Sequence, residues 1–207
     1  STRMRDMDTR TDTRQRLIDS ARDLIYARSY SDVGVQEICD RAGVRKGSFY
    51  HFFPSKRDLT LAVLDQFQAF FRHEILGRAF DDDIPPLQRI DRFFDYAAEF
   101  QRQMKQDTGQ MPGCPFGNIA CEMSTQDEAI RLRVEQIMQD AEIPFERALA
   151  EAMANGDLPE IDTAATASAL FAYVEGVMVY AKTRNEPEMV RELGKRALQL
   201  VIPERLA

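Results

Sequence analysis

The chain has 207 residues, of which 44% are hydrophobic, which suits one fair-sized domain or a small domain joined to a larger one. It has neither a run of about 20 uninterrupted apolar residues nor a signal-peptide pattern, so we expect a cytoplasmic protein without a membrane partner. Its three cysteines, Cys39, Cys114 and Cys121, are odd in number and lack zinc-ligand spacing, which argues against a disulfide framework.

The net charge of −7 is unevenly distributed along the chain. Residues 1–60 contain 12 Lys and Arg against 9 Asp and Glu, whereas residues 61–207 contain 15 against 25. A basic N-terminal part and an acidic C-terminal part would orient the protein on DNA, because the phosphates attract the first and repel the second. Taken alone, so small an excess favours an ordinary solvated surface.

The spacing of apolar residues predicts helices along almost the whole chain and no strands, so we expect an all-α fold of about nine helices. Residues 1–10 are polar and without a period, and we expect a mobile arm there. The acidic triplet at 81–83 lacks the Gly and distal Glu of a calcium loop, so a solvated turn without metal is expected. The predicted helices cover residues 13–28, 36–42, 45–52, 56–77, 86–106, a short stretch from 115, 127–155, 162–185 and 187–201.

Residues 33–59, VGVQEICDRAGVRKGSFYHFFPSKRDL, have the pattern of a helix-turn-helix. Ile38, Ala42 and Val44 are apolar at the offsets that let two short helices pack, and Gly43 lies where the chain must turn sharply. The second helix would present its N-terminal residues to base edges while polar groups around it hold phosphates.

The stretch AGVRKGSFYHFFPSK at 42–56 resembles the tetracycline-repressor (TetR) family of bacterial regulators, whose pattern is A-G-V-x-K-G-[ST]-x-Y-x-[HY]-F-x-[SN]-K. Gly34 departs from the Thr or Ser usual in the family, a change that an N-cap tolerates. The resemblance implies a DNA-binding module at 1–55, a helical domain for ligand binding and dimerisation at 56–207, and operator DNA as partner. The residues expected to contact DNA are Gln36, Arg45, Lys46, Gly47, Ser48, Tyr50, His51 and Lys56.

Two helical segments near the C-terminus carry stripes of small and apolar residues. In the resembled family, such helices form a four-helix bundle with a second subunit, which implies a homodimer. The stripes could also be core within one chain, and some residues can serve both purposes. The expected interface residues are Ala165, Ala169, Ala172, Gly176, Val190, Leu193 and Ala197.

The ligand pocket is harder to place, because the helical body contains many aromatic residues and most of them are core. A small-molecule effector without a cofactor is expected, bound by apolar walls with few polar groups. Glu175 interrupts an apolar run. Three interpretations are open: it anchors a ligand, it pairs with a buried polar group, or it lies on an exposed edge of the helix. The expected ligand residues are Phe67, Phe94, Cys114, Phe116, Asn118, Phe171 and Glu175.

The segment MPGCPFGN at 111–118 resembles the G-C-x-x-G-N element of one TetR branch, which includes regulators of reductases that act on reactive electrophiles. Because Cys114 precedes Pro115, its sulfur could lie at a helix N-terminus, where the dipole favours a reactive thiolate. The alternative, which we favour, is an inert cysteine that shapes a turn.

Two other functions compete with a regulator. A thiol-dependent enzyme would need a base beside Cys114, and no nucleophile, nucleotide or metalloprotease motif is present. Glu122 is one distant candidate for that base. A helical protein-binding adaptor would leave the basic stretch at 45–56 unexplained. The sequence therefore predicts a regulator and no enzyme.

Overall fold

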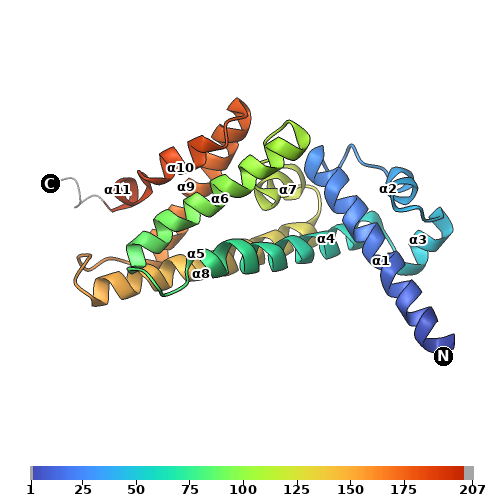
Figure 1. The fold of residues 1–207 in the computed structure, drawn as a ribbon, viewed down its shortest axis with the longest axis horizontal. Coiled ribbons are helices and arrows are strands. Elements are labelled where there is room, and N and C mark those ends of the chain that lie inside the picture. The colour runs from blue at the N-terminus through green and yellow to red at the C-terminus, as the bar shows by residue number, and fades with distance from the viewer. Residues whose placement is uncertain (1, 203–207) are drawn as a thin grey trace. The chain divides into compact units, whose positions relative to one another are not determined.

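The computed structural model describes the backbone of residues 2–202, and every regular element in that range is a helix (Figure 1). The chain divides into two compact units. The N-terminal unit contains the chain up to Gln68 together with Asn118–Val134, and the C-terminal unit contains Ala69–Gly117 and the chain from Glu135 onward. These units follow packing, so the functional boundary predicted at residue 55 stays a prediction.

The N-terminal unit begins with α1 (Thr2–Ala27), α2 (Val35–Ala42) and α3 (Lys46–Phe52), followed by the start of α4 (Lys56–Phe70). The segment predicted as a mobile arm is helical from Thr2 onward, and its mobility stays a prediction. No Gly or Pro interrupts this polar segment, so a helix can extend through it without an apolar period. Helix α2 packs against both α1 and α3.

The turn between α2 and α3 has the predicted geometry. Gly43 has φ 64° and ψ 37°, a left-handed conformation that a residue without a Cβ adopts easily. The turn is closed by the N–H of Val44, which donates to the carbonyl of Cys39 at 2.9 Å. Ile38 and Phe49 are fully buried below it. The helix-turn-helix is therefore a packed unit with a fixed angle between its helices.

The predicted helix 56–77 is not α-helical throughout. After α4, the chain forms a π-helical turn, η1 (Phe71–Leu76), and then the short α5 (Gly77–Ala79). The N–H of Gly77 donates to the carbonyl of Arg72, five residues earlier, which is the spacing of a π-turn. Apolar periodicity does not distinguish such a turn from an α-helix.

The C-terminal unit is built from α6 (Pro86–Thr108), the start of α7 (Pro115–Met123), most of α8 (Glu128–Ala154), α9 (Thr163–Arg184), α10 (Glu188–Gly194) and α11 (Ala197–Val201). Helix α10 packs on α6 and α9, as Figure 1 shows. The predicted last helix is broken between α10 and α11. At the end of α10, a Cβ on Gly194 would lie 2.3 Å from the ring of Phe94, so this close packing needs glycine.

Helix α9 is long and apolar enough to cross a membrane by length and composition alone. Its residues Ala167, Leu170, Phe171, Val174, Val177, Met178 and Ala181 are buried in the unit's own core. The core helix of a globular protein has the same composition, so this feature is weak evidence for a membrane span.

Candidate functional site

The polar residues of α3 lie on the surface of the N-terminal unit. Arg45 is the N-cap of α3, with extended backbone at φ −70° and ψ 142°, and Phe49 anchors the helix in the core. Tyr50 is 53% exposed. The structure thus places one group of predicted DNA-binding residues together on one short exposed helix, namely Arg45, Lys46, Gly47, Ser48, Tyr50 and His51.

The other two predicted DNA-binding residues already make contacts within the unit. The amide of Gln36 donates to Asp40 at 2.8 Å on exposed α2. The ammonium of Lys56 donates to the carbonyl of Tyr30 and lies 4.0 Å from the centre of the Tyr30 ring. Burial lowers the pKa of Lys56, an effect that nearby Glu122 partly opposes. Lys56 therefore has a structural role beside any contact with phosphate.

Sequence patterns alone do not indicate the role of Glu122 on α7. Its two carboxylate oxygens accept hydrogen bonds from the backbone N–H groups of Tyr30, at 2.8 Å, and Ser31, at 2.7 Å. Burial alone would raise the pKa of Glu122, but these bonds, the Ser31 side chain and Lys56 together lower it. The turn between α1 and α2 is thus held by an ionised residue about 90 positions away. With both oxygens occupied, Glu122 is a poor candidate for the base of a thiol enzyme.

The turn before α7 is held by a second residue that the sequence did not single out. Gln101 is buried in α6, and its amide both accepts from the N–H of Gly113, at 3.0 Å, and donates to the Gly113 carbonyl, at 2.9 Å. Gly113 has φ 80°, which favours glycine. This clamp fixes the backbone on which Cys114 lies.

Cys114 and Glu175 lie in contact in the C-terminal unit. The Cys114 sulfur accepts a hydrogen bond from the N–H of Gly117 at 3.5 Å, and a Cβ built on Gly117 would lie within 4 Å of both Cys114 and Glu175. One Glu175 oxygen, Oε1, is buried without a partner in the described part of the chain. A Cβ on Gly117 would lie 2.2 Å from Glu175 Oε2, so the missing side chain makes room for the carboxylate.

The electrostatics oppose a reactive thiolate at Cys114. Burial and the charge of Glu175 raise its pKa well above the usual value, and the backbone N–H groups of Gly117 and Phe116 only partly offset this. Burial also raises the pKa of Glu175. The helix terminus is present as predicted, but its favourable N–H groups are outweighed by desolvation. At rest, Cys114 is a thiol.

The remaining predicted ligand residues are dispersed. Phe94 and Phe171 are core residues of the C-terminal unit, and Phe116 packs edge-on against Phe71. Phe67 belongs to the N-terminal unit, where it packs against Tyr26, with ring centres 5.2 Å apart. Asn118 is half-buried in the same unit. Among the predicted ligand residues, Cys114 and Glu175 are polar groups that the C-terminal unit brings into contact.

The predicted interface residues separate into two groups. Ala165, Ala169, Ala172 and Gly176 lie on the exposed face of α9, close in sequence to exposed Val179 and Tyr180. Val190 and Ala197 are instead fully buried in their own chain, and Leu193 is half-buried. Their side chains follow the intramolecular alternative that the sequence left open.

Comparisons with known proteins agree with the helix-turn-helix and the helical second unit. Residues 17–63 match the family model described as bacterial regulatory proteins, tetR family, and residues 86–196 match the tetracyclin repressor-like C-terminal domain. Transcriptional regulator AcuR from Cereibacter sphaeroides is 32% identical, over 84% of this chain and 78% of AcuR. The HTH-type transcriptional repressor DhaR from a Mycobacterium species is 26% identical, over 94% of each chain.

A solved structure of regulatory protein TetR from Rhodobacter sphaeroides superposes with a TM-score of 0.77 and 29% identity, covering 88% of this chain and 95% of that one. The exposed α3 and the helical second unit define a helix-turn-helix transcription regulator. The chain belongs to the TetR family. Its place in the branch with the G-C-x-x-G-N element stays a prediction.

Proposed function

We propose that this regulator is a cytoplasmic repressor whose homodimer binds an operator in double-stranded DNA and is released by a small-molecule effector. The exposed start of α3 is the observation that carries the proposal. Arg45 and Lys46 are exposed there, and buried Phe49 fixes the orientation of the helix. A recognition helix reads the major groove with its first residues, so this is where base-reading groups belong.

Within that surface we assign different roles to different residues. Arg45 reads a base, which we take to be guanine, because O6 and N7 of guanine accept two hydrogen bonds from a guanidinium group. Lys46, Ser48, Tyr50 and His51 hold phosphates, while Gly47 lets the backbone come close to the DNA. Gln36 and Lys56 add polar contacts from α2 and α4.

The dimer interface that we propose is the exposed face of α9. Ala165, Ala169, Ala172 and Gly176 are all exposed, and a Cβ at Gly176 would meet no atom within 4 Å. Small residues at this spacing let a second helix approach closely. Two recognition helices are also needed, because a single short helix contacts too few bases for useful specificity.

We assign effector binding to the surroundings of Cys114 and Glu175, with α7 as the link to the DNA-binding module. Gly117 in the first turn of α7 adjoins Glu175, and Glu122 in its last turn holds the backbone of Tyr30 and Ser31. A ligand that displaces Glu175 would act on the first turn of this helix. It changes DNA affinity only if it binds the two states of the protein unequally.

Two rival functions are less well supported. An adaptor would give no reason for the exposed basic start of α3. A thiol enzyme would need an activated cysteine, whereas burial and Glu175 raise the pKa of Cys114. We therefore propose that the chain has no enzymatic activity.

The test is retention on immobilised DNA. The protein should bind duplex DNA at low salt and elute as salt is added, because phosphate contacts release counterions. An Ala169→Arg variant should sediment as a monomer and be retained less, while Ala164→Arg, at an exposed position beside the stripe, serves as the control. The proposal would be refuted if the wild-type protein sediments as a monomer at micromolar concentration, or if duplex DNA does not retain it at low salt.

A further inference from the structure

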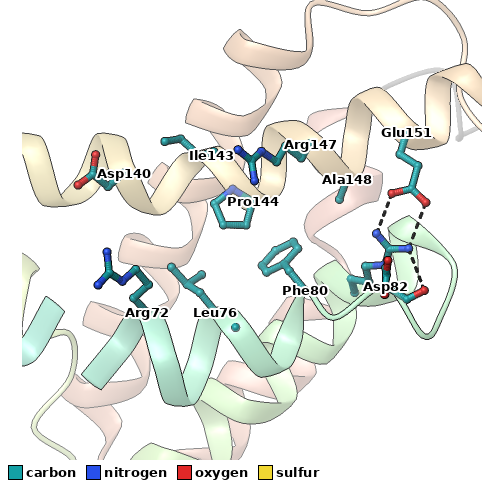
Figure 2. Close-up of a pocket in the computed structure, with 12 residues that line it drawn as sticks. Arg72, Leu76, Phe80, Asp82, Asp140, Ile143, Pro144, Arg147, Ala148 and Glu151 are labelled. Carbon is teal, nitrogen blue, oxygen red and sulfur yellow. Dashed lines mark hydrogen bonds and ion pairs between the residues drawn. The ribbon is translucent and has the colours of Figure 1, made fainter. Parts of the chain in front are cut away.

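We infer a second ligand site in the C-terminal unit: a groove between η1, α5 and α8 that binds an amphipathic carboxylate. The cavity has a volume of about 730 Å³, and it contains none of the residues assigned to the effector above (Figure 2). The inference does not depend on the proposed function, because binding in the groove can be measured without DNA.

Both walls of the groove depart from regular α-helix. On one side is the π-turn η1, which ends at Leu76 and is followed by Gly77. On the other side is Pro144, which lies inside α8 and has no N–H to donate to the carbonyl of Asp140. An interior proline costs a helix about 3 kcal/mol, and π-turns occur frequently at functional sites. Two such irregularities therefore shape the walls of this one cavity.

The floor of the groove is apolar. Leu76 and Phe80 line it from η1 and just beyond α5, and Ile143, Pro144 and Ala148 line it from α8. Ile143 is 43% exposed. An alkyl chain in the groove would remove this apolar surface from water, which is the main source of affinity for such ligands.

Two arginines in the groove give it a preference for anions. Arg72 and Arg147 are exposed, and the guanidinium group of neither makes a hydrogen bond or ion pair with any described residue. They project from opposite walls (Figure 2). Arg89, at the other end of the groove, is instead paired with Glu151 at 2.7 Å. A guanidinium group without a partner is well suited to a carboxylate, which it can bind through two hydrogen bonds.

Acidic side chains in the groove limit the negative charge that a ligand can carry. Asp82, Asp140 and Glu151 also line the groove, so its lining contains three carboxylates and three arginines. A dianion would meet these carboxylates, whereas a single carboxylate can bind to Arg72 or Arg147 and extend its chain over the apolar floor. We therefore commit to a monocarboxylate with an unbranched apolar chain.

The experiment compares decanoate with decan-1-ol, which has the same chain and no charge, by titration calorimetry on the full-length protein. Decanoate should bind about tenfold or more tightly than the alcohol, because hydrogen bonds to charged groups contribute strongly. The double variant Arg72→Gln with Arg147→Gln should reduce decanoate affinity to that of the alcohol and leave alcohol affinity unchanged. Ile143→Gln should weaken both ligands.

The matched control is Arg102→Gln with Arg196→Gln, which removes the same charge from exposed positions outside the groove. This control should bind decanoate like the wild type. The inference is overturned if the wild type binds neither ligand, if it binds both equally, or if the Arg72 and Arg147 double variant keeps its preference for decanoate.

Discussion

Gly117 and Glu175 are matched in space: a Cβ at Gly117 would lie 2.2 Å from Glu175 Oε2. The same carboxylate lies beside the Cys114 thiol, and its charge adds to burial in raising the pKa of that thiol. Gly117, the second glycine of the G-C-x-x-G-N element, therefore has a specific physical role: it lets the Glu175 carboxylate approach Cys114.

Gly117→Ala should lower the pKa of Cys114, because the new methyl group forces the Glu175 carboxylate away from the sulfur. The free energy of unfolding should fall by at most about 2 kcal/mol, since the displaced atoms end a flexible side chain. The measurement is the pH dependence of alkylation of Cys114 in a Cys121→Ser background. In a Glu175→Ala background, Gly117→Ala should no longer affect the pKa of Cys114. An unchanged pKa in the single variant would refute the displacement.

Glu175→Gln should stabilise the protein increasingly as the pH rises. Burial raises the folded-state pKa of Glu175 above 4.5. The folded state then holds a proton that the unfolded state loses, so wild-type stability falls as the pH rises from 4.5 through the folded-state pKa. Glutamine has no such proton to lose. Chemical unfolding from pH 4 to about pH 8 measures the gain, and a gain that is constant over this range would contradict the prediction.

The two partly accessible cysteines should differ in reactivity. Cys121 is exposed, whereas burial and Glu175 raise the pKa of Cys114. Because only the thiolate attacks, a maleimide at neutral pH should modify Cys121 first and Cys114 many times more slowly. Peptide mapping by mass spectrometry follows both sites. Rapid modification of Cys114, with loss of DNA binding that Cys114→Ser abolishes, would instead support the reactive-sensor alternative.

Glu122→Gln should destabilise the N-terminal unit by about 1–2 kcal/mol at neutral pH, because it weakens the hydrogen bonds that hold Tyr30 and Ser31. The wild-type contribution is complete above the ordinary pKa of 4.5 and is lost as the pH falls through the lowered folded-state pKa. The difference between the two proteins should therefore shrink in acid. Glu128→Gln, at an exposed position in α8, is the control. Equal effects of both substitutions would contradict a specific role for Glu122.

The sequence predicted the helical fold and the recognition helix well, because both follow from local patterns. Gly43 and buried Phe49 illustrate this: turn chemistry and apolar spacing within 20 residues determine their places. The pattern failed at residues 2–12 of α1, which are polar and have no apolar period to detect, and at η1, where the period resembles that of an α-helix.

The ligand residues were predicted less well, because their environment depends on distant parts of the chain. Cys114 and Glu175 are 61 positions apart, and only the fold shows that the carboxylate raises the pKa of the thiol. Glu122 was considered only as a base, since nothing local indicates its bonds to Tyr30 and Ser31. The aromatic residues predicted for the pocket are no guide to its place, because aromatic side chains occur both in cavity walls and in the core.

In the proposed function, α3 reads a DNA sequence as part of a dimeric repressor. The most direct measurement selects a binding site from random duplexes and then compares the affinity of wild type and Arg45→Ala for that site and for single-base variants. The wild type should select a site with two symmetric halves, and Arg45→Ala should lose about 1–3 kcal/mol of discrimination at one position in each half. Selection of no common sequence, or an Arg45→Ala loss that is equal on every sequence, would contradict the account.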